Sequence, residues 1–252
     1  RRRDGVTEVF DGSAGLPSGR VNHLLETADG TLWAATHGGG VARFDGTRFA
    51  PVGTGLPDPR VWSLLERRDA LGRARLVAAC EGGVAELGEG ERFAPIDLGT
   101  SLAGISANAL LETDDGGERS LWVGTFGAGL FRVHAAGVDR FGPEEGLGSR
   151  FVTSLAATGP RGSETVWVGT RDAGLYRLRG RAFEPVALGA EPLSIYALAG
   201  GGAGAPETLW VGTRLSGLLR VQPTPWAPFD ADSGLPGDQV FSFLETRGAE
   251  GG

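Results

Sequence analysis

One ten-residue motif returns along this chain at a nearly constant interval. It reads LWVGTFGAGL at 121–130, VWVGTRDAGL at 166–175 and LWVGTRLSGL at 209–218. Related versions are TLWAAT at 31–36 and RLVAAC at 75–80, and the aligned residues Trp33, Val77, Trp122, Trp167 and Trp210 are 44, 45, 45 and 43 residues apart. Self-similarity with a period of roughly 20 to 50 residues indicates a repeat architecture. The chain therefore has to fold from about five equivalent units.

A second recurring segment defines the content of each unit. It appears as VNHLLE, VWSLLE, ANALLE, VTSLAA, IYALAG and VFSFLE, starting at residues 21, 61, 107, 152, 195 and 240. In the first unit it is followed by TLWAAT, VARF and RFAPV, with Asp-Gly or glycine-rich turns between the runs. Such turns between apolar runs are typical of antiparallel hairpins, and no segment keeps a helical period. Four short strands in a unit of this length indicate the blade of a β-propeller.

We therefore predict an all-β fold for residues 1–252, a β-propeller of four-stranded antiparallel blades. We expect about five complete blades with partial blades at both ends, an open arc of a seven-bladed propeller. An alternative is that the two end pieces complete one shared blade and close a six-bladed ring. The expected complete blades span residues 15–53, 54–98, 99–143, 144–188 and 189–232, after the end of a preceding blade at 1–14 and before the start of a further blade at 233–252.

Composition excludes several functional classes. The net charge is −7 and the chain has no basic run beyond residues 1–3, so nucleic-acid binding has little electrostatic support. Cys80 is the one cysteine and stands on an expected core strand, which predicts a buried, inert thiol. No apolar run approaches the roughly 20 residues needed to cross a bilayer, so we expect any membrane anchor outside this chain. No phosphate-binding or dinucleotide motif is present, and we expect no cofactor.

The residues that vary within the motif are the candidates for ligand binding. They follow the threonine of the second strand or precede the first strand of the next blade, and strand alternation places both sets at one end of the propeller. The candidates are Arg20, His37, Arg60, Glu81, Phe126, Arg150, Arg171 and Arg214. Guanidinium groups suit the carboxylate or sulfate of an acidic sugar, and Phe126 could stack on a sugar face. The alternative is that these are ordinary solvated hairpin tips.

Catalytic and metal-binding alternatives have weaker support in the sequence. A lyase or glycosidase needs a positioned acid or base, and only Glu81 and His37 could serve at the variable positions. A metal site on His23 and His37 lacks carboxylates at ligand spacing. FDADSG at 229–234 has the alternating aspartates of a calcium loop but no Glu at its end, and the similar FDGSAG at 10–15 favours an Asx-stabilised turn for both. We therefore predict that this region has no catalytic residues and holds no metal.

The repeat resembles a known family. The pattern GLP-x-x-x-V-x-x-LLE-x-x-DG-x-LWVGT-x-x-GL-x-R, as in Gly15 to Arg43, is similar to the two-component regulator propeller repeat, and it recurs over nearly the whole chain. The second unit departs from it in lacking the tryptophan, and the fifth replaces GLP by Ala-Glu-Pro-Leu.

This resemblance implies a sensor region. In that family the propeller is implied to be the periplasmic part of an inner-membrane signalling protein that senses a ligand, frequently a glycan fragment. The output module is commonly a hybrid histidine kinase, sometimes a diguanylate cyclase or a DNA-binding domain, and we expect the parent to be a homodimer. No such output module is visible in this sequence. A plain protein-interaction scaffold is an alternative that the sequence does not separate from a sensor.

Overall fold

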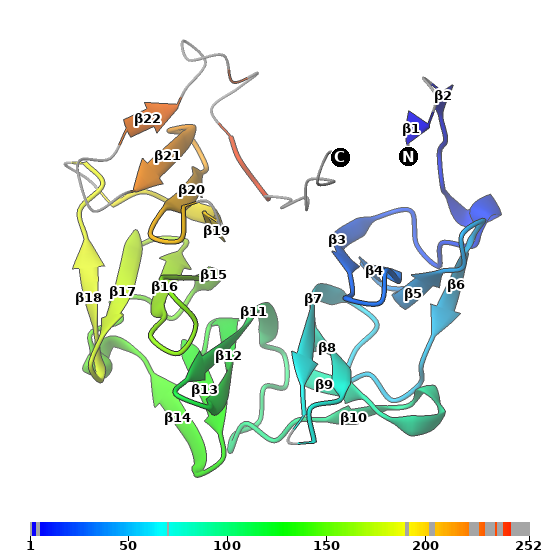
Figure 1. The fold of residues 1–252 in the computed structure, drawn as a ribbon, viewed down its shortest axis with the longest axis horizontal. Coiled ribbons are helices and arrows are strands. Elements are labelled where there is room, and N and C mark those ends of the chain that lie inside the picture. The colour runs from blue at the N-terminus through cyan, green and yellow to red at the C-terminus, as the bar shows by residue number, and fades with distance from the viewer. Residues whose placement is uncertain are drawn as a thin grey trace. The chain divides into compact units, whose positions relative to one another are not determined.

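The computed structural model describes residues 2–3, 6–69, 71–189, 192–201, 205–221, 227–229, 235 and 239–242. Within them the chain is all-β and forms five four-stranded antiparallel sheets, the blades of a β-propeller (Figure 1). In each blade the strands pair in the order in which they occur along the chain. The predicted fold class is confirmed. Most of the further blade expected at 233–252 lies outside the described residues, and the expected blade boundaries stay a prediction.

Two compact units divide the chain, residues 1–110 and 111–252. The first unit holds the pair β1 (Arg2–Arg3) and β2 (Val6–Thr7), a first blade of β3 (Val21–Glu26), β4 (Leu32–Thr36), β5 (Gly40–Phe44) and β6 (Phe49–Val52), and a second blade of β7 (Val61–Arg68), β8 (Ala74–Cys80), β9 (Gly83–Leu87) and β10 (Phe93–Pro95).

The third blade, whose first strand begins before residue 111, and the fourth and fifth blades make up most of the second unit. They consist of β11 (Ser106–Asp115), β12 (Glu118–Phe126), β13 (Leu130–His134) and β14 (Gly137–Phe141); β15 (Val152–Thr158), β16 (Thr165–Thr170), β17 (Leu175–Arg179) and β18 (Ala182–Val186); and β19 (Ile195–Gly200), β20 (Leu209–Thr213), β21 (Leu218–Val221) and β22 (Ala227–Phe229). Three short 3-10 helices, Gly12–Ala14, Glu89–Glu91 and Pro143–Glu145, lie in the connections. The first of them is capped by Asp11, whose carboxylate accepts a hydrogen bond from the Ser13 amide, in agreement with the turn predicted for FDGSAG.

The recurring tryptophan packs between neighbouring blades. In the first unit, Trp33 of β4 shares one buried cluster with Val61 and Leu64 of β7. In the second unit, Trp122 shares a cluster with Val152 of the next blade, and Trp167 shares one with Ile195. The indole N–H groups of all three are satisfied, because they donate to threonine hydroxyls, Thr27, Thr113 and Thr158 respectively. Blade-to-blade burial of apolar side chains is therefore what the repeat preserves.

A buried hydroxyl closes the hairpin between the second and third strands. The threonine of the motif donates its hydroxyl to the carbonyl oxygen of the glycine four residues later, at 2.9, 2.7, 2.7 and 2.8 Å. The donors are Thr36, Thr125, Thr170 and Thr213, all buried. In the second blade Cys80 pairs with Gly83, so that hairpin is one residue shorter and needs no such hydroxyl. The threonine and glycine of the motif thus recur because together they hold a three-residue tip.

The glycine before that threonine has a separate duty. A Cβ on Gly169 would collide with Ser154 of the paired strand β15 and with Ile195 at the start of β19, and one on Gly212 would collide with Val240. This glycine therefore leaves room for a close approach of the next segment of chain. In the first and second blades Ala35 and Ala79 occupy the position.

Equivalent residues of the first two blades differ sharply in burial. Val61 and Leu64 on β7 are 0% and 3% exposed, because the first blade covers them. Val21 and Leu24, their counterparts on β3, are 39% and 50% exposed. The first blade therefore exposes these apolar residues of its first strand. The equivalent residues of the second blade are buried against the first blade.

This difference predicts unequal effects of one substitution at two equivalent sites. Leu64→Ala should lower the free energy of unfolding by about 2–5 kcal/mol, because it leaves a cavity between blades. Leu24→Ala should cost less than about 1 kcal/mol, because the leucine is half exposed. Urea unfolding of both variants measures the two values. Equal losses would contradict the prediction and show that the Leu24 face is covered in solution.

Candidate ligand-binding rim

The variable residues of neighbouring blades lie beside one another, as strand alternation predicts. We call this set of hairpin tips and preceding-loop residues the rim. In the first unit the amide of His37 donates to the carbonyl of Arg20, and the amide of Glu81 donates to that of Arg60. In the second unit the amide of Arg171 donates to the carbonyl of Phe151, and the amide of Arg214 donates to that of Ser194. Isolated bridges join His37 to Arg60, Glu81 to Ser106 and Phe126 to Phe151. Each of these tip residues thus lies beside a residue that precedes or begins a first strand.

The candidates of the first unit are engaged by their own neighbours. The guanidinium of Arg60 forms two hydrogen bonds of 2.9 Å with the carboxylate of Asp58, one from Nε and one from Nη2. These bonds with Arg60 lower the pKa of Asp58 and raise that of Arg60. The Glu81 carboxylate accepts the hydroxyl of Ser106. Arg60 is therefore already paired with a carboxylate, and Glu81 already accepts a hydrogen bond, before any ligand arrives.

His37 packs against an aromatic residue of the next blade. Its ring is 5.2 Å from that of Trp62, edge to face. His37 Nδ1 and Trp62 Nε1 are both buried and have no hydrogen-bond partner within the described residues. Arg20 is exposed, and its carbonyl is the acceptor that holds the His37 amide.

The candidates of the second unit form an aromatic and cationic group. The rings of Phe126 and Phe151 are 4.8 Å apart, and Phe151 is 37% exposed. The guanidinium carbon of Arg171 lies 5.2 Å from the centre of the Phe126 ring. Within the described part of the chain, neither Arg171 nor Arg214 makes an ion pair. These arginines can therefore offer their N–H groups to an anion.

Phe151, and not Arg150, occupies the rim position of the fourth blade. Phe151 forms a β-bridge with Phe126, and its carbonyl oxygen accepts a hydrogen bond from the Arg171 amide. Arg150 precedes Phe151 by one residue. Arg150 contributes its carbonyl, which accepts the amides of Gly127 and Gly129 in the neighbouring tip, and it is exposed. The sequence alignment of the loops missed this shift because GLGSRF has Phe where the GLP loops have Arg or Gln.

Sequence reasoning also missed the second residue of four first strands, β3, β7, β15 and β19. The strand pairing slips around Asn22, Trp62, Thr153 and Tyr196, which marks a bulge at each of these positions. A bulge re-aims the side chain. Asn22 and Thr153 use it to donate to the carbonyls of Val61 and Ile195 in the next blade, at 2.7 and 2.6 Å. Trp62 instead meets His37, and Tyr196 stacks edge-on with Phe241, 62% exposed. The sequence does contain a signal for these positions, because the residue there changes from polar Asn22 and Thr153 to aromatic Trp62 and Tyr196.

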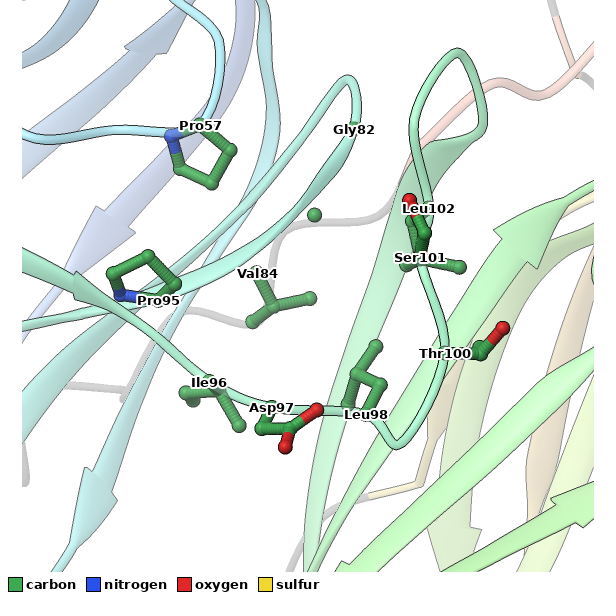
Figure 2. Close-up of a pocket in the computed structure, with 11 residues that line it drawn as sticks. Pro57, Gly82, Val84, Pro95, Ile96, Asp97, Leu98, Thr100, Ser101 and Leu102 are labelled. Carbon is green, nitrogen blue, oxygen red and sulfur yellow. The ribbon is translucent and has the colours of Figure 1, made fainter.

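A pocket of about 430 Å³ lies beside the second-blade tip (Figure 2). Its walls are mostly apolar side chains, including Pro57, Val84, Leu98 and Leu102, with Asp97 as its one charged lining residue. None of the sequence-predicted candidates lines it. Its chemistry therefore differs from the arginine-rich site that the sequence predicts.

The remaining candidates of the sequence have structural roles or lie outside the described residues. Burial raises the pKa of the Cys80 thiol to about 12, in agreement with an inert cysteine. Within the described residues, no group of three or more His, Cys, Asp or Glu side chains could hold a metal ion. None of the helices found there is long and apolar enough to cross a membrane. The calcium-like segment beginning at Phe229 lies outside the described residues from position 230 onward.

The family model described as "Two component regulator propeller" matches residues 15–38. The chain contains a two-component regulator propeller repeat. The match spans the Gly-Leu-Pro turn, β3 and β4, and it includes the rim residues Arg20 and His37. The resemblance predicted from the sequence is confirmed. No curated protein sequence matches the chain.

Solved structures share the fold of this chain. The extracellular domain of BT3049 from B. thetaiotaomicron, assigned to a hybrid two-component system, is 17% identical with a TM-score of 0.72, over 93% of this chain and 32% of that chain. The extracellular domain of BT4673 from the same organism is 18% identical with a TM-score of 0.65, over 83% and 27%. The chain thus spans about a third or less of these relatives. A streptogramin B lyase is 14% identical with a TM-score of 0.68, over 90% and 73%. At these identities the likeness shows the fold alone.

His23 gives the folded chain a testable dependence on pH. It holds a position on β3 where other first strands have Ser or Ala, and burial lowers its pKa. Its Nδ1 accepts the Leu64 amide at 3.3 Å, so the folded state requires the neutral ring. Because the unfolded chain takes up a proton near pH 6.5 and the folded chain only at lower pH, stability falls as the pH drops below about 6.5.

We expect the free energy of unfolding to decrease more steeply between about pH 7.5 and 5.5 in the native chain than in His23→Ser. Urea unfolding at a series of pH values checks this. Parallel pH profiles for the two proteins would contradict a neutral, buried His23.

Proposed function

We propose that this chain is the ligand-sensing, non-catalytic propeller region of a bacterial two-component-type signalling protein. The observation that carries the proposal is the combination of the regulator repeat with a rim whose residues vary from blade to blade. Packing residues are repeated because each blade faces a like neighbour, whereas rim residues are free to differ. A rigid scaffold that presents unlike polar and aromatic side chains at one end is suited to recognising a ligand.

The location and assembly belong to the same proposal. Two of the structures with this fold are extracellular domains assigned to two-component systems. By analogy, the propeller lies in the periplasm, as the extracytoplasmic part of an inner-membrane protein. The parent acts as a homodimer, and its output module is a histidine kinase or a diguanylate cyclase. Ligand binding alters the packing of that dimer and so changes the output.

The ligand proposed for the rim is a small acidic molecule, such as an acidic glycan fragment. The candidate residues are Arg20, His37, Arg60, Glu81, Phe126, Arg150, Arg171 and Arg214. Five of the eight are arginines, and guanidinium groups bind carboxylates and sulfates through paired N–H bonds. The positive rim contrasts with the net charge of −7 of the whole chain.

An enzyme of the lyase type is the second candidate, because a streptogramin B lyase shares the fold. Such an enzyme needs an acid and a base within reach of one substrate atom. Glu81 is held by Ser106, and His37 packs on Trp62. Because each is engaged by a different partner, the rim offers this chemistry less support than it offers binding.

The coding sequence on both sides of this chain tests the sensor proposal. We expect a membrane-spanning segment followed by a kinase or cyclase module, because a periplasmic sensor must be joined to its output. Sequencing the intact gene gives the answer without any assumption about the ligand. A gene that completes the propeller and then stops would contradict the signalling role and favour a secreted binding protein or enzyme.

A further inference from the structure

We infer that Phe126, Phe151 and Arg171 form a subsite for an acidic pyranose, in which the sugar ring stacks on Phe151 and its carboxylate pairs with Arg171. This inference rests on the proposed ligand-binding role and specifies where the ligand binds and what it is. The three residues come from the tips and preceding loop of the third and fourth blades, within the second unit. Phe151 lies between the other two, because it bridges Phe126 and accepts the Arg171 amide at 3.0 Å.

The aromatic pair offers an open apolar surface. Phe126 is half-buried and Phe151 is 37% exposed, at a ring separation of 4.8 Å and an interplanar angle of 57°. Packing covers most of the surface of both residues, but it leaves 37% of Phe151 exposed to water. The C–H face of a pyranose can cover such a surface and remove it from water.

Arg171 is positioned but not neutralised. Its guanidinium lies over the Phe126 ring at 5.2 Å, which orients the planar group while leaving the N–H edges free. Within the described residues it makes no ion pair, in contrast to Arg60 of the first unit, which is bound on two nitrogens by Asp58. An oriented guanidinium without a carboxylate is the arrangement that bidentate binding of a ligand anion requires.

The charges around the subsite favour an anion. Arg150 immediately precedes Phe151 and is exposed. Ser194 connects Arg171 with Arg214, because its hydroxyl donates to the Arg171 carbonyl and its carbonyl accepts the Arg214 amide. The nearest carboxylate in sequence, Asp172, accepts the hydroxyl of Ser149. Three arginines against one hydrogen-bonded aspartate leave this part of the rim positive in a chain whose net charge is −7. A neutral sugar would contact the phenylalanine rings but would have no carboxylate to pair with Arg171.

Titration of the whole chain with digalacturonic acid, its neutral counterpart galactobiose, and acetate tests this inference. By isothermal titration calorimetry or chemical-shift perturbation, digalacturonic acid should bind about tenfold or more tightly than galactobiose, and acetate should bind more weakly than either, because it lacks the ring. Added salt should weaken the acidic sugar selectively. Acetate that binds as well as digalacturonic acid would overturn the sugar assignment and leave an anion site.

Variants separate the two contacts. Arg171→Ala should abolish the preference for the acidic sugar, whereas Phe151→Leu should weaken both sugars by a similar factor. Arg140→Ala is the matched control, because Arg140 also lies over a phenylalanine, Phe131 at 5.8 Å, but on the outer strand β14. It should leave binding unchanged. Arg171→Lys keeps the charge without the fork, so it should retain part of the preference if Arg171 acts directly.

The inference would be overturned if Arg171→Ala binds digalacturonic acid as tightly as the native chain does. It would also be overturned if Arg140→Ala loses as much affinity as Arg171→Ala. Failure of this subsite and failure of the sensor role can be told apart. An intact gene that encodes a membrane sensor, together with absent sugar binding, rejects the subsite alone. Sugar binding by a propeller without any output module rejects the signalling role and leaves the subsite standing.

Discussion

The hydrogen bond from a buried threonine hydroxyl to a glycine carbonyl is the contact on which the rim depends. It occurs in four of the five blades, at 2.7 to 2.9 Å, and closes the tip between the second and third strands. In three of these tips the same hydroxyl also accepts a tip amide, from Ala128, Ala173 or Ser216. Because the bond is formed by the hydroxyl and a main-chain carbonyl, the residue after the threonine can change without loss of the tip.

This division of labour connects packing with recognition. Tryptophan and the aliphatic residues bury the faces between blades, and the glycine before the threonine admits the next blade. The tips are left to carry His37, Glu81, Phe126, Arg171 and Arg214. In the first unit Arg60 is paired with Asp58, whereas in the second unit Arg171 and Arg214 have no acidic partner among the described residues. The chemistry of the rim therefore differs between the two units although the scaffold repeats.

The architecture could be predicted from the sequence because the same motif recurs at a nearly constant interval. The spacing of Trp33, Val77, Trp122, Trp167 and Trp210 predicts the blades, and strand alternation predicts that tips and preceding loops meet. The finer geometry was not accessible. Bulges at Trp62 and Tyr196 depend on local strand pairing, and the shift from Arg150 to Phe151 depends on how one loop is measured against its neighbours. The neutralisation of Arg60 by Asp58 also required coordinates, because many pairs at this spacing make no contact.

The role of the threonine bond is best tested by amide hydrogen exchange in Thr170→Val. Valine keeps the volume but removes the donor to Gly174 O and the acceptor of the Ala173 amide, at 2.7 and 3.1 Å. Thr165→Val is the control, because its hydroxyl has no hydrogen-bond partner among the described residues. The amides of residues 171–174 should exchange about tenfold faster or more in Thr170→Val and remain unchanged in Thr165→Val. Equal exchange at this tip in the two variants would contradict the view that the threonine holds the rim.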